Sequence, residues 1–180
     1  MKLALLFAAA VGVALVLWSW RARAQGVEAF MAGNAKTAAE LTDEKVERFL
    51  VFWKVRAEFS SAATPSVLRG LKDGGYDGVV AAAQQNAGVF KSAEEAAAAK
   101  SGLSEREGLA LFMLLATHYQ SIYAATNSHN DAWLATTRAA FARRHGQAAL
   151  DIVTRHEREA LALVAQRNEA LKAQMQNVGP

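Results

Sequence analysis

The chain has 180 residues, of which 52% are hydrophobic, with 20 basic residues, 17 acidic residues and a formal net charge of +3. This length suits one domain, and the absence of cysteine excludes disulfides, thiolate metal sites, covalent haem attachment and a lipid-modified cysteine. Three basic residues (Lys2, Arg21 and Arg23) lie within the first 24 positions, so the rest of the chain is formally neutral and has no basic footprint for nucleic acid.

The first 24 residues combine an apolar run with a basic end. Residues 3–18 (LALLFAAAVGVALVLW) are apolar without interruption, and Ala22 and Ala24 form the A-x-A pattern that a signal peptidase recognises. We therefore predict a signal peptide that is cleaved after Ala24. Cleavage would place the mature protein in the periplasm or another extracytoplasmic compartment.

An uncleaved anchor is the alternative interpretation of the same segment. Extended to Trp20, the apolar run would span about 27 Å as a helix, close to the bilayer core of about 30 Å. Trp18 and Trp20 would then lie at the interface, and Arg21 and Arg23 among the headgroups. In that case residues 1–24 would contact the inner membrane and tether the protein to it.

Residues 25–40 show little periodicity and predict a linker, whereas residues 41–180 are predicted to form the helical domain. The domain opens with a clear helix start, because Thr42 can cap with its hydroxyl and Leu41 can pack on Val46. Apolar residues follow helical spacing on two faces, as is typical of a helix central in a bundle. The aromatic stripe is predicted to be core, with a partner groove as the alternative: Phe49, Phe52, Trp53 and Phe59.

The next helix is predicted to start with Thr64 as its cap, followed by Pro65 at the first helical position. The glycine-rich sequence DGGYDG, residues 73–78, is predicted to end it. This sequence lacks the spacing of phosphate-binding and calcium-binding loops, so we interpret it as a turn.

Two helices are predicted between this turn and residue 102. The first is short and closes at Gly88, and the second begins at a capping box formed by Ser92 and Glu95 and ends at Gly102.

A second capping box, Ser104 with Glu107, is predicted to begin a long helix that continues to about Ala125. The residues expected on its inner side are Leu111, Phe112, Leu115, Tyr119 and Ile122.

The sequence NSHND, residues 127–131, predicts a break before a helix that ends at about His145 beside Gly146. The longest helix is then predicted from Gln147 to about Gln176. The residues expected to face inward from these two helices are Trp133, Leu134, Thr137, Phe141, Leu150, Val153, Leu161, Val164, Leu171 and Met175. The charged residues of the last helix, Arg167 among them, are interpreted as a solvated face.

The chemistry-bearing residues favour neither catalysis nor metal binding. The histidines lack the spacing of a helical metal site and are interpreted as surface or helix-end residues: His118, His129, His145 and His156. No nucleophile elbow occurs. We therefore predict no catalytic residue, cofactor or metal, and interpret the chain as non-enzymatic.

The densest polar and aromatic cluster lies at residues 118–133. Because loops carry sites, we predict a partner surface there, with a capped loop beside core aromatics as the alternative. The predicted surface comprises Tyr119, Tyr123, Asn127, His129, Asn130 and Asp131.

The sequence as a whole predicts an all-α fold: an irregular bundle of about five to seven helices preceded by an N-terminal hydrophobic signal or anchor helix. The predicted function is that of an exported protein that binds another protein, in an adaptor, accessory or chaperone-like role. Two alternatives stay open. One is a single-pass anchored accessory subunit of a membrane complex, and the other is a small-ligand binder or enzyme with a pocket among its helices. A deep cavity with convergent buried polar groups would favour the last.

Overall fold

The computed structural model describes residues 36, 37 and 39–177, and within them all regular structure is helical, without strands. The predicted all-α class is therefore confirmed for this part of the chain. The predicted signal or anchor segment, including Ala22 and Ala24, lies outside the described residues. None of the helices within the described residues is both long and apolar enough to cross a bilayer.

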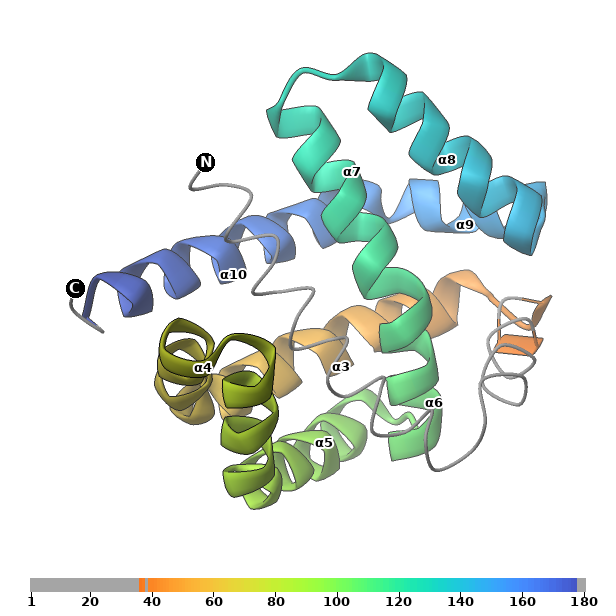
Figure 1. Cartoon of the computed structure of the whole chain (residues 1–180). Helices are drawn as coiled ribbons and strands as arrows, with labels where there is room; N and C mark the ends of the chain where they lie inside the picture. Colours follow the sequence, from red (N-terminus) through yellow and green to blue (C-terminus); the bar gives the residue numbers. More distant parts are fainter. Residues whose placement is uncertain (1–35, 38, 178–180) are drawn as a thin grey trace.

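The described chain forms one bundle of helices (Figure 1). Six helices result when α6, η2 and α7 are taken as one continuous helix and α9 and α10 as one broken helix, which agrees with the predicted five to seven. The elements in order are α3 (Asp43–Ser60), the 3-10 turn η1 (Ser61–Ala63), α4 (Thr64–Gln85), α5 (Ala87–Ser101), α6 (Glu105–Leu111), the π-helix η2 (Phe112–Ala116), α7 (Thr117–Asn127), α8 (Asp131–His145), α9 (Gln147–Arg155) and α10 (Glu157–Asn177).

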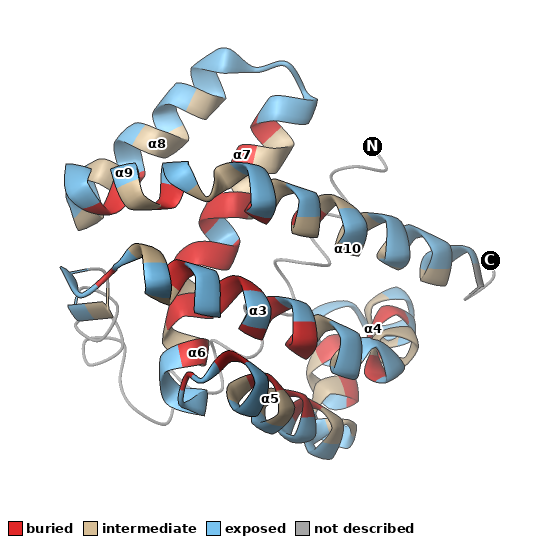
Figure 2. Ribbon diagram, turned by 180° about the vertical axis from the view of Figure 1, so that it is seen from behind, coloured by how far each residue is buried: buried red, intermediate tan, exposed pale blue. Residues whose placement is uncertain are grey.

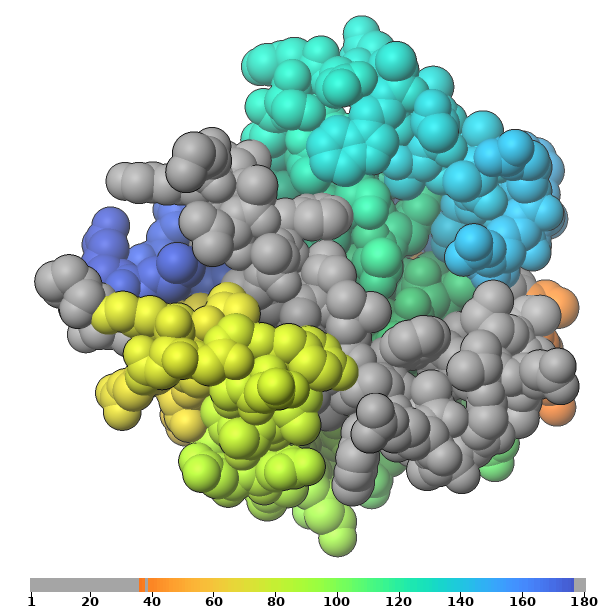
Figure 3. Space-filling view, in the orientation of Figure 1, coloured from red at the N-terminus to blue at the C-terminus, as the bar shows by residue number. Residues whose placement is uncertain are grey.

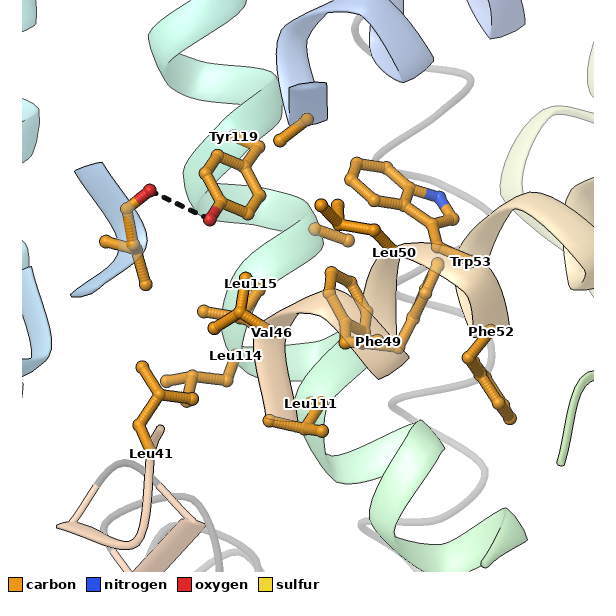
Figure 4. Close-up of a cluster of buried hydrophobic side chains, with 14 of the residues drawn as sticks. Leu41, Val46, Phe49, Leu50, Phe52, Trp53, Leu111, Leu114, Leu115 and Tyr119 are labelled. Carbon is orange, nitrogen blue, oxygen red and sulfur yellow. Dashed lines mark hydrogen bonds between the residues drawn. The ribbon is translucent and has the colours of Figure 1, made fainter. Parts of the chain in front are cut away.

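Helix α3 lies at the centre of the bundle, packed most extensively against α5 and also touching α6, α9 and α10. Its buried face runs along most of its length (Figure 2). The aromatic residues Phe49, Phe52 and Trp53 are buried, which confirms them as core, whereas Phe59 is 49% exposed because it points outward at the end of α3. The inner side predicted for the α6–α7 helix is also buried: Leu111, Phe112, Leu115, Tyr119 and Ile122. Figure 4 shows Leu111, Leu115 and Tyr119 in this core.

Helix ends that depend on a local cap agree with the prediction. The Lys45 backbone N–H donates to Thr42 Oγ1 at 3.2 Å. Ser104 and Glu107 form the reciprocal capping box, with backbone-to-side-chain distances of 3.1 and 3.2 Å. Gly102 ends α5 in the left-handed conformation, at φ 71°. In each case the sequence signal and the bond it makes lie within one helical turn.

The predicted cap at Thr64 is wrong. The chain enters α4 directly from η1 with helical backbone angles, so no extended residue precedes the helix and Thr64 is its first residue. Its hydroxyl instead donates back to the Ser60 carbonyl at 3.5 Å. The predicted capping box at Ser92 is wrong for a similar reason, because α5 already begins at Ala87 and contains both Gly88 and Ser92.

The sequence DGGYDG does break the chain, but inside α4 rather than at its end. Gly75 has φ 55° and ψ −133°, which turns the helix back on itself. The two arms meet at Gly70 and Gly78, where a Cβ on either residue would overlap the backbone of the other. The turn therefore brings Val79 of the second arm next to the first arm.

The predicted single helix from Gln147 breaks at His156, between α9 and α10. At this break Asp43 of α3 accepts from Arg155 Nε and Nη2 at 2.9 and 2.7 Å, and lies 2.9 Å from His156 Nε2. The hydrogen bonds from Arg155 and then His156 lower the pKa of Asp43 to about 2. These contacts join the start of α3 to the α9–α10 junction.

Two smaller expectations are also corrected. Trp133 was expected to face inward but is 37% exposed. The residue that α8 buries is Phe141. Part of the predicted 25–40 linker is helical, since the Glu40 N–H bonds to the Lys36 carbonyl at 3.1 Å.

Candidate functional site

The predicted partner surface at the α7–α8 corner is divided by the structure. Tyr119 is fully buried, because it lies on the inner side of α7, and its hydroxyl donates to the Val153 carbonyl at 3.0 Å (Figure 4). Its assignment to a surface is therefore wrong. Tyr123 is half-buried, and the remaining predicted residues are exposed: Asn127, His129, Asn130 and Asp131.

Several of these exposed residues have local structural roles. Asn130 caps α8 by accepting from the Trp133 backbone N–H at 2.9 Å, and Asn127 donates to the Tyr123 carbonyl at 2.8 Å. His129 occupies the left-handed region at φ 50° in the turn between the helices. The geometry of the corner is that of a capped loop, and a partner bound there stays a prediction.

The histidines do not converge on a site. Among the described residues no group of three or more histidine, aspartate or glutamate side chains is placed to hold a metal ion. His118 was expected at the surface or a helix end, but it is 6% exposed and packs on Phe141 with ring centroids 4.3 Å apart. Burial, followed by the charges of Arg138 and His145, lowers its pKa to about 4.

A pocket of about 110 Å³ lies between α3, α4 and α10. Helix α4 and the C-terminal part of α10 are neighbours on the surface of the molecule (Figure 3). The apolar part of the lining is Val67, Leu68, Leu71, Val79, Phe90 and Leu171, and the polar part is Arg56, Arg167, Ser60, Ser61, Thr64 and Gln174.

Arg56 enters this pocket from the centre of the bundle. The residue is 5% exposed, and its guanidinium carbon lies 4.6 Å from the centroid of the Phe112 ring. Its Nη2 lies 3.4 Å from Oε1 of Glu94, a long contact for a charged pair. Its Nε is buried and has no hydrogen-bond acceptor in the described part of the chain. Burial lowers the pKa of Arg56, and Glu94 partly offsets that effect.

Arg167 reaches the same pocket from α10. Its Nη1 is buried without an acceptor, and no carboxylate of the described residues lies within ion-pair distance of it. Burial, and then the nearby charge of Arg56, lowers the pKa of Arg167 to about 10. Within the described part of the chain, Glu94 is the one carboxylate at ion-pair distance from either guanidinium group.

The folds of η2 and α4 position this pocket. Phe112 is the first residue of the π-helix, a feature often found at functional sites. Its ring stacks against the guanidinium group of Arg56. The contact between Gly70 and Gly78 closes the α4 turn and brings Val79 to the pocket wall. The arrangement offers two cationic donors beside an apolar surface, which is the chemistry of anion binding.

Sequence reasoning missed both arginines, and Arg167 was wrongly assigned to a solvated face. A signal was available in the helical spacing. Arg56 follows Trp53 by three residues, and Arg167 lies three residues after Val164 and four before Leu171. Each arginine is thus in phase with a buried stripe.

No protein-family model, no curated protein and no solved structure matches this chain.

Proposed function

We propose that the protein binds a small anionic molecule in the pocket between α3, α4 and α10. The observation that carries this proposal is that two buried guanidinium nitrogens at the pocket, Nε of Arg56 and Nη1 of Arg167, have no acceptor in the described residues. Leaving a buried donor unsatisfied costs about 1–3 kcal/mol, and a buried charge costs more. A bound anion would supply the missing acceptors and the missing negative charge.

Two hydroxyls at the pocket are held by helical carbonyls: Ser60 donates to Ala57 at 3.4 Å and Ser61 donates to Glu58 at 2.6 Å. The role that we propose for the pocket is binding, because two guanidinium groups beside an apolar wall can hold an anion.

The test is a titration of the protein and two methionine variants with acetate, pentanoate and phosphate, followed by calorimetry. Arg167→Met keeps the length of the side chain and removes its charge. We expect it to weaken anion binding at least tenfold while leaving the unliganded protein as stable as before or more stable, because a buried unpaired charge is removed. Arg158→Met is the matched control, since Arg158 lies on the same helix and is exposed.

Two results would count against binding at this pocket. One is unchanged affinity in Arg167→Met, and the other is failure of the wild-type protein to bind any of the three anions. A large loss of stability in Arg167→Met would instead indicate that the arginine serves the fold.

Export and contact with a protein partner form a second proposal. The supporting observations are the apolar run before Ala24 and helix α8, whose one buried residue is Phe141. Intact mass and fractionation of natively expressed protein test export and cleavage, and retention of residues 1–24 in the membrane fraction would favour the anchored subunit. Photo-crosslinking from position 129 tests whether a partner protein binds at the α7–α8 corner. A crosslink that persists when the probe is moved to the far end of the molecule would contradict binding at this corner.

A further inference from the structure

Building on the proposed anion site, we infer that its ligand is a monocarboxylate with a short apolar chain of about four or five carbons. The inference depends on four properties of the pocket: its charge balance, the donor atoms that remain free, its apolar wall and its volume.

The charge balance selects a single negative charge. Arg56 and Arg167 contribute two positive charges, and Glu94 contributes one negative charge. One carboxylate completes the neutralisation. A sulfate or doubly charged phosphate would leave an uncompensated negative charge against an apolar wall, which is unfavourable.

The remaining donors suit the two oxygens of one carboxylate. Glu94 already contacts Nη2 of Arg56, and Phe112 covers one face of its guanidinium group. Five buried side-chain nitrogens lack a partner in the described part of the chain, and two of them, Nε of Arg56 and Nη1 of Arg167, belong to residues that line the pocket. Both arginines line the same pocket, so one ligand can meet both. Guanidinium donors form strong, directional bonds to carboxylates.

The apolar wall accounts for the rest of the ligand. Side chains from both arms of α4, from α5 and from α10 surround the space beside the arginines: Val67, Leu68, Leu71, Val79, Phe90 and Leu171. An inorganic anion would leave this surface uncovered, whereas an alkyl chain would cover it. Each buried methylene is expected to raise affinity about fourfold.

The volume limits the length of the chain. An apolar cavity of about 150 Å³ accommodates the six carbons of benzene, so a pocket of about 110 Å³ takes roughly four to five ligand atoms. Pentanoate, whose alkyl chain has four carbons beyond the carboxylate, is therefore the probe chosen for the test.

The experiment is isothermal titration of the full-length protein with acetate, butanoate, pentanoate, decanoate, 1-pentanol, succinate and phosphate. We expect affinity to rise about fourfold per methylene from acetate to pentanoate and then to stop rising. We expect 1-pentanol, succinate and phosphate to bind at least tenfold more weakly than pentanoate. The series of monocarboxylates varies the chain length, and 1-pentanol removes the charge. Succinate adds a second charge, and phosphate lacks the alkyl chain.

A wall variant keeps the test independent of the arginines. Val79→Thr has nearly the same shape and places a hydroxyl against the alkyl chain. It should weaken pentanoate binding about tenfold and acetate binding less than twofold. Val51→Thr, at an exposed position of α3, should change neither.

The possible results distinguish failure of the monocarboxylate inference from failure of the proposed anion site. Tighter binding of phosphate or succinate than of pentanoate would overturn the inference of a monocarboxylate ligand and leave the proposed anion site standing. Equal affinity for acetate and pentanoate would overturn the role of the apolar wall. Absence of binding by every anion would overturn the proposed function itself.

Discussion

The guanidinium carbon of Arg56 lies 4.6 Å from the ring centroid of Phe112, so the buried cation of α3 rests on the first residue of the π-helix. Phe112 is in turn held by Trp53, whose ring meets it edge-on at a centroid distance of 6.1 Å. This stack covers one face of the guanidinium group of a residue that lines the pocket. The position of the π-helix thereby becomes part of the proposed binding site.

Replacing Phe112 by leucine should therefore weaken pentanoate binding about two- to thirtyfold, because a cation–π contact is worth roughly 0.5–2 kcal/mol. The measurement is titration calorimetry on the folded variant. Phe141→Leu is the control, since Phe141 is a buried aromatic residue that does not line the pocket. Equal affinity in the two variants would show that the ring only fills space.

Tyr119→Phe should lower the free energy of unfolding by about 1–2 kcal/mol. The Tyr119 hydroxyl donates to the Val153 carbonyl, which lies in the last turn of α9, where carbonyls lose their intrahelical partners. Urea denaturation measures the change, with Tyr123→Phe as a half-buried control. An unchanged midpoint in Tyr119→Phe would mean that this carbonyl finds another donor.

His118 should make the fold less stable as the pH falls from 6.5 to about 4. Its pKa is lowered to about 4 by burial, so over this range the unfolded chain binds a proton that the folded chain does not. The loss amounts to about 3 kcal/mol at full effect. Denaturation at several pH values should show a shallower dependence in His118→Leu than in the wild type. Parallel curves would contradict the assignment.

Substitution of two glycines of α4 by alanine should change the free energy of unfolding in opposite directions. Gly78→Ala should cost about 1–3 kcal/mol, because the new Cβ would overlap the backbone of Gly70 across the turn. Gly74→Ala meets nothing within 4 Å and should be stabilising by about 0.5–1 kcal/mol, because alanine is the better helix former. Thermal unfolding measures both, and equal shifts would contradict the close approach of the two arms.

The sequence was informative where one helical turn holds both the signal and its partner. Thr42, Ser104 and Gly102 mark helix ends correctly because their caps are local. Ser92 carries the same type of signal and fails, because α5 begins at Ala87, six residues before the helix start that a cap at Ser92 predicts. Local patterns cannot report whether a neighbouring segment continues the helix.

The pocket was missed for a related reason. The positions of Arg56 and Arg167 in phase with buried stripes are visible in the sequence, but their convergence is not. It depends on α10 crossing α4 and on the reversal at Gly75, which was expected to end a helix rather than fold it back. The all-α class needed neither feature, so it could be predicted while the site could not.

The most direct test of the central claim is a crystal structure of the protein with pentanoate. The account predicts carboxylate oxygens about 2.7–3.0 Å from Nε of Arg56 and Nη1 of Arg167, with the alkyl chain against Val79 and Leu171. Pentanoate bound elsewhere, or a carboxylate of the protein itself on both arginines, would contradict it.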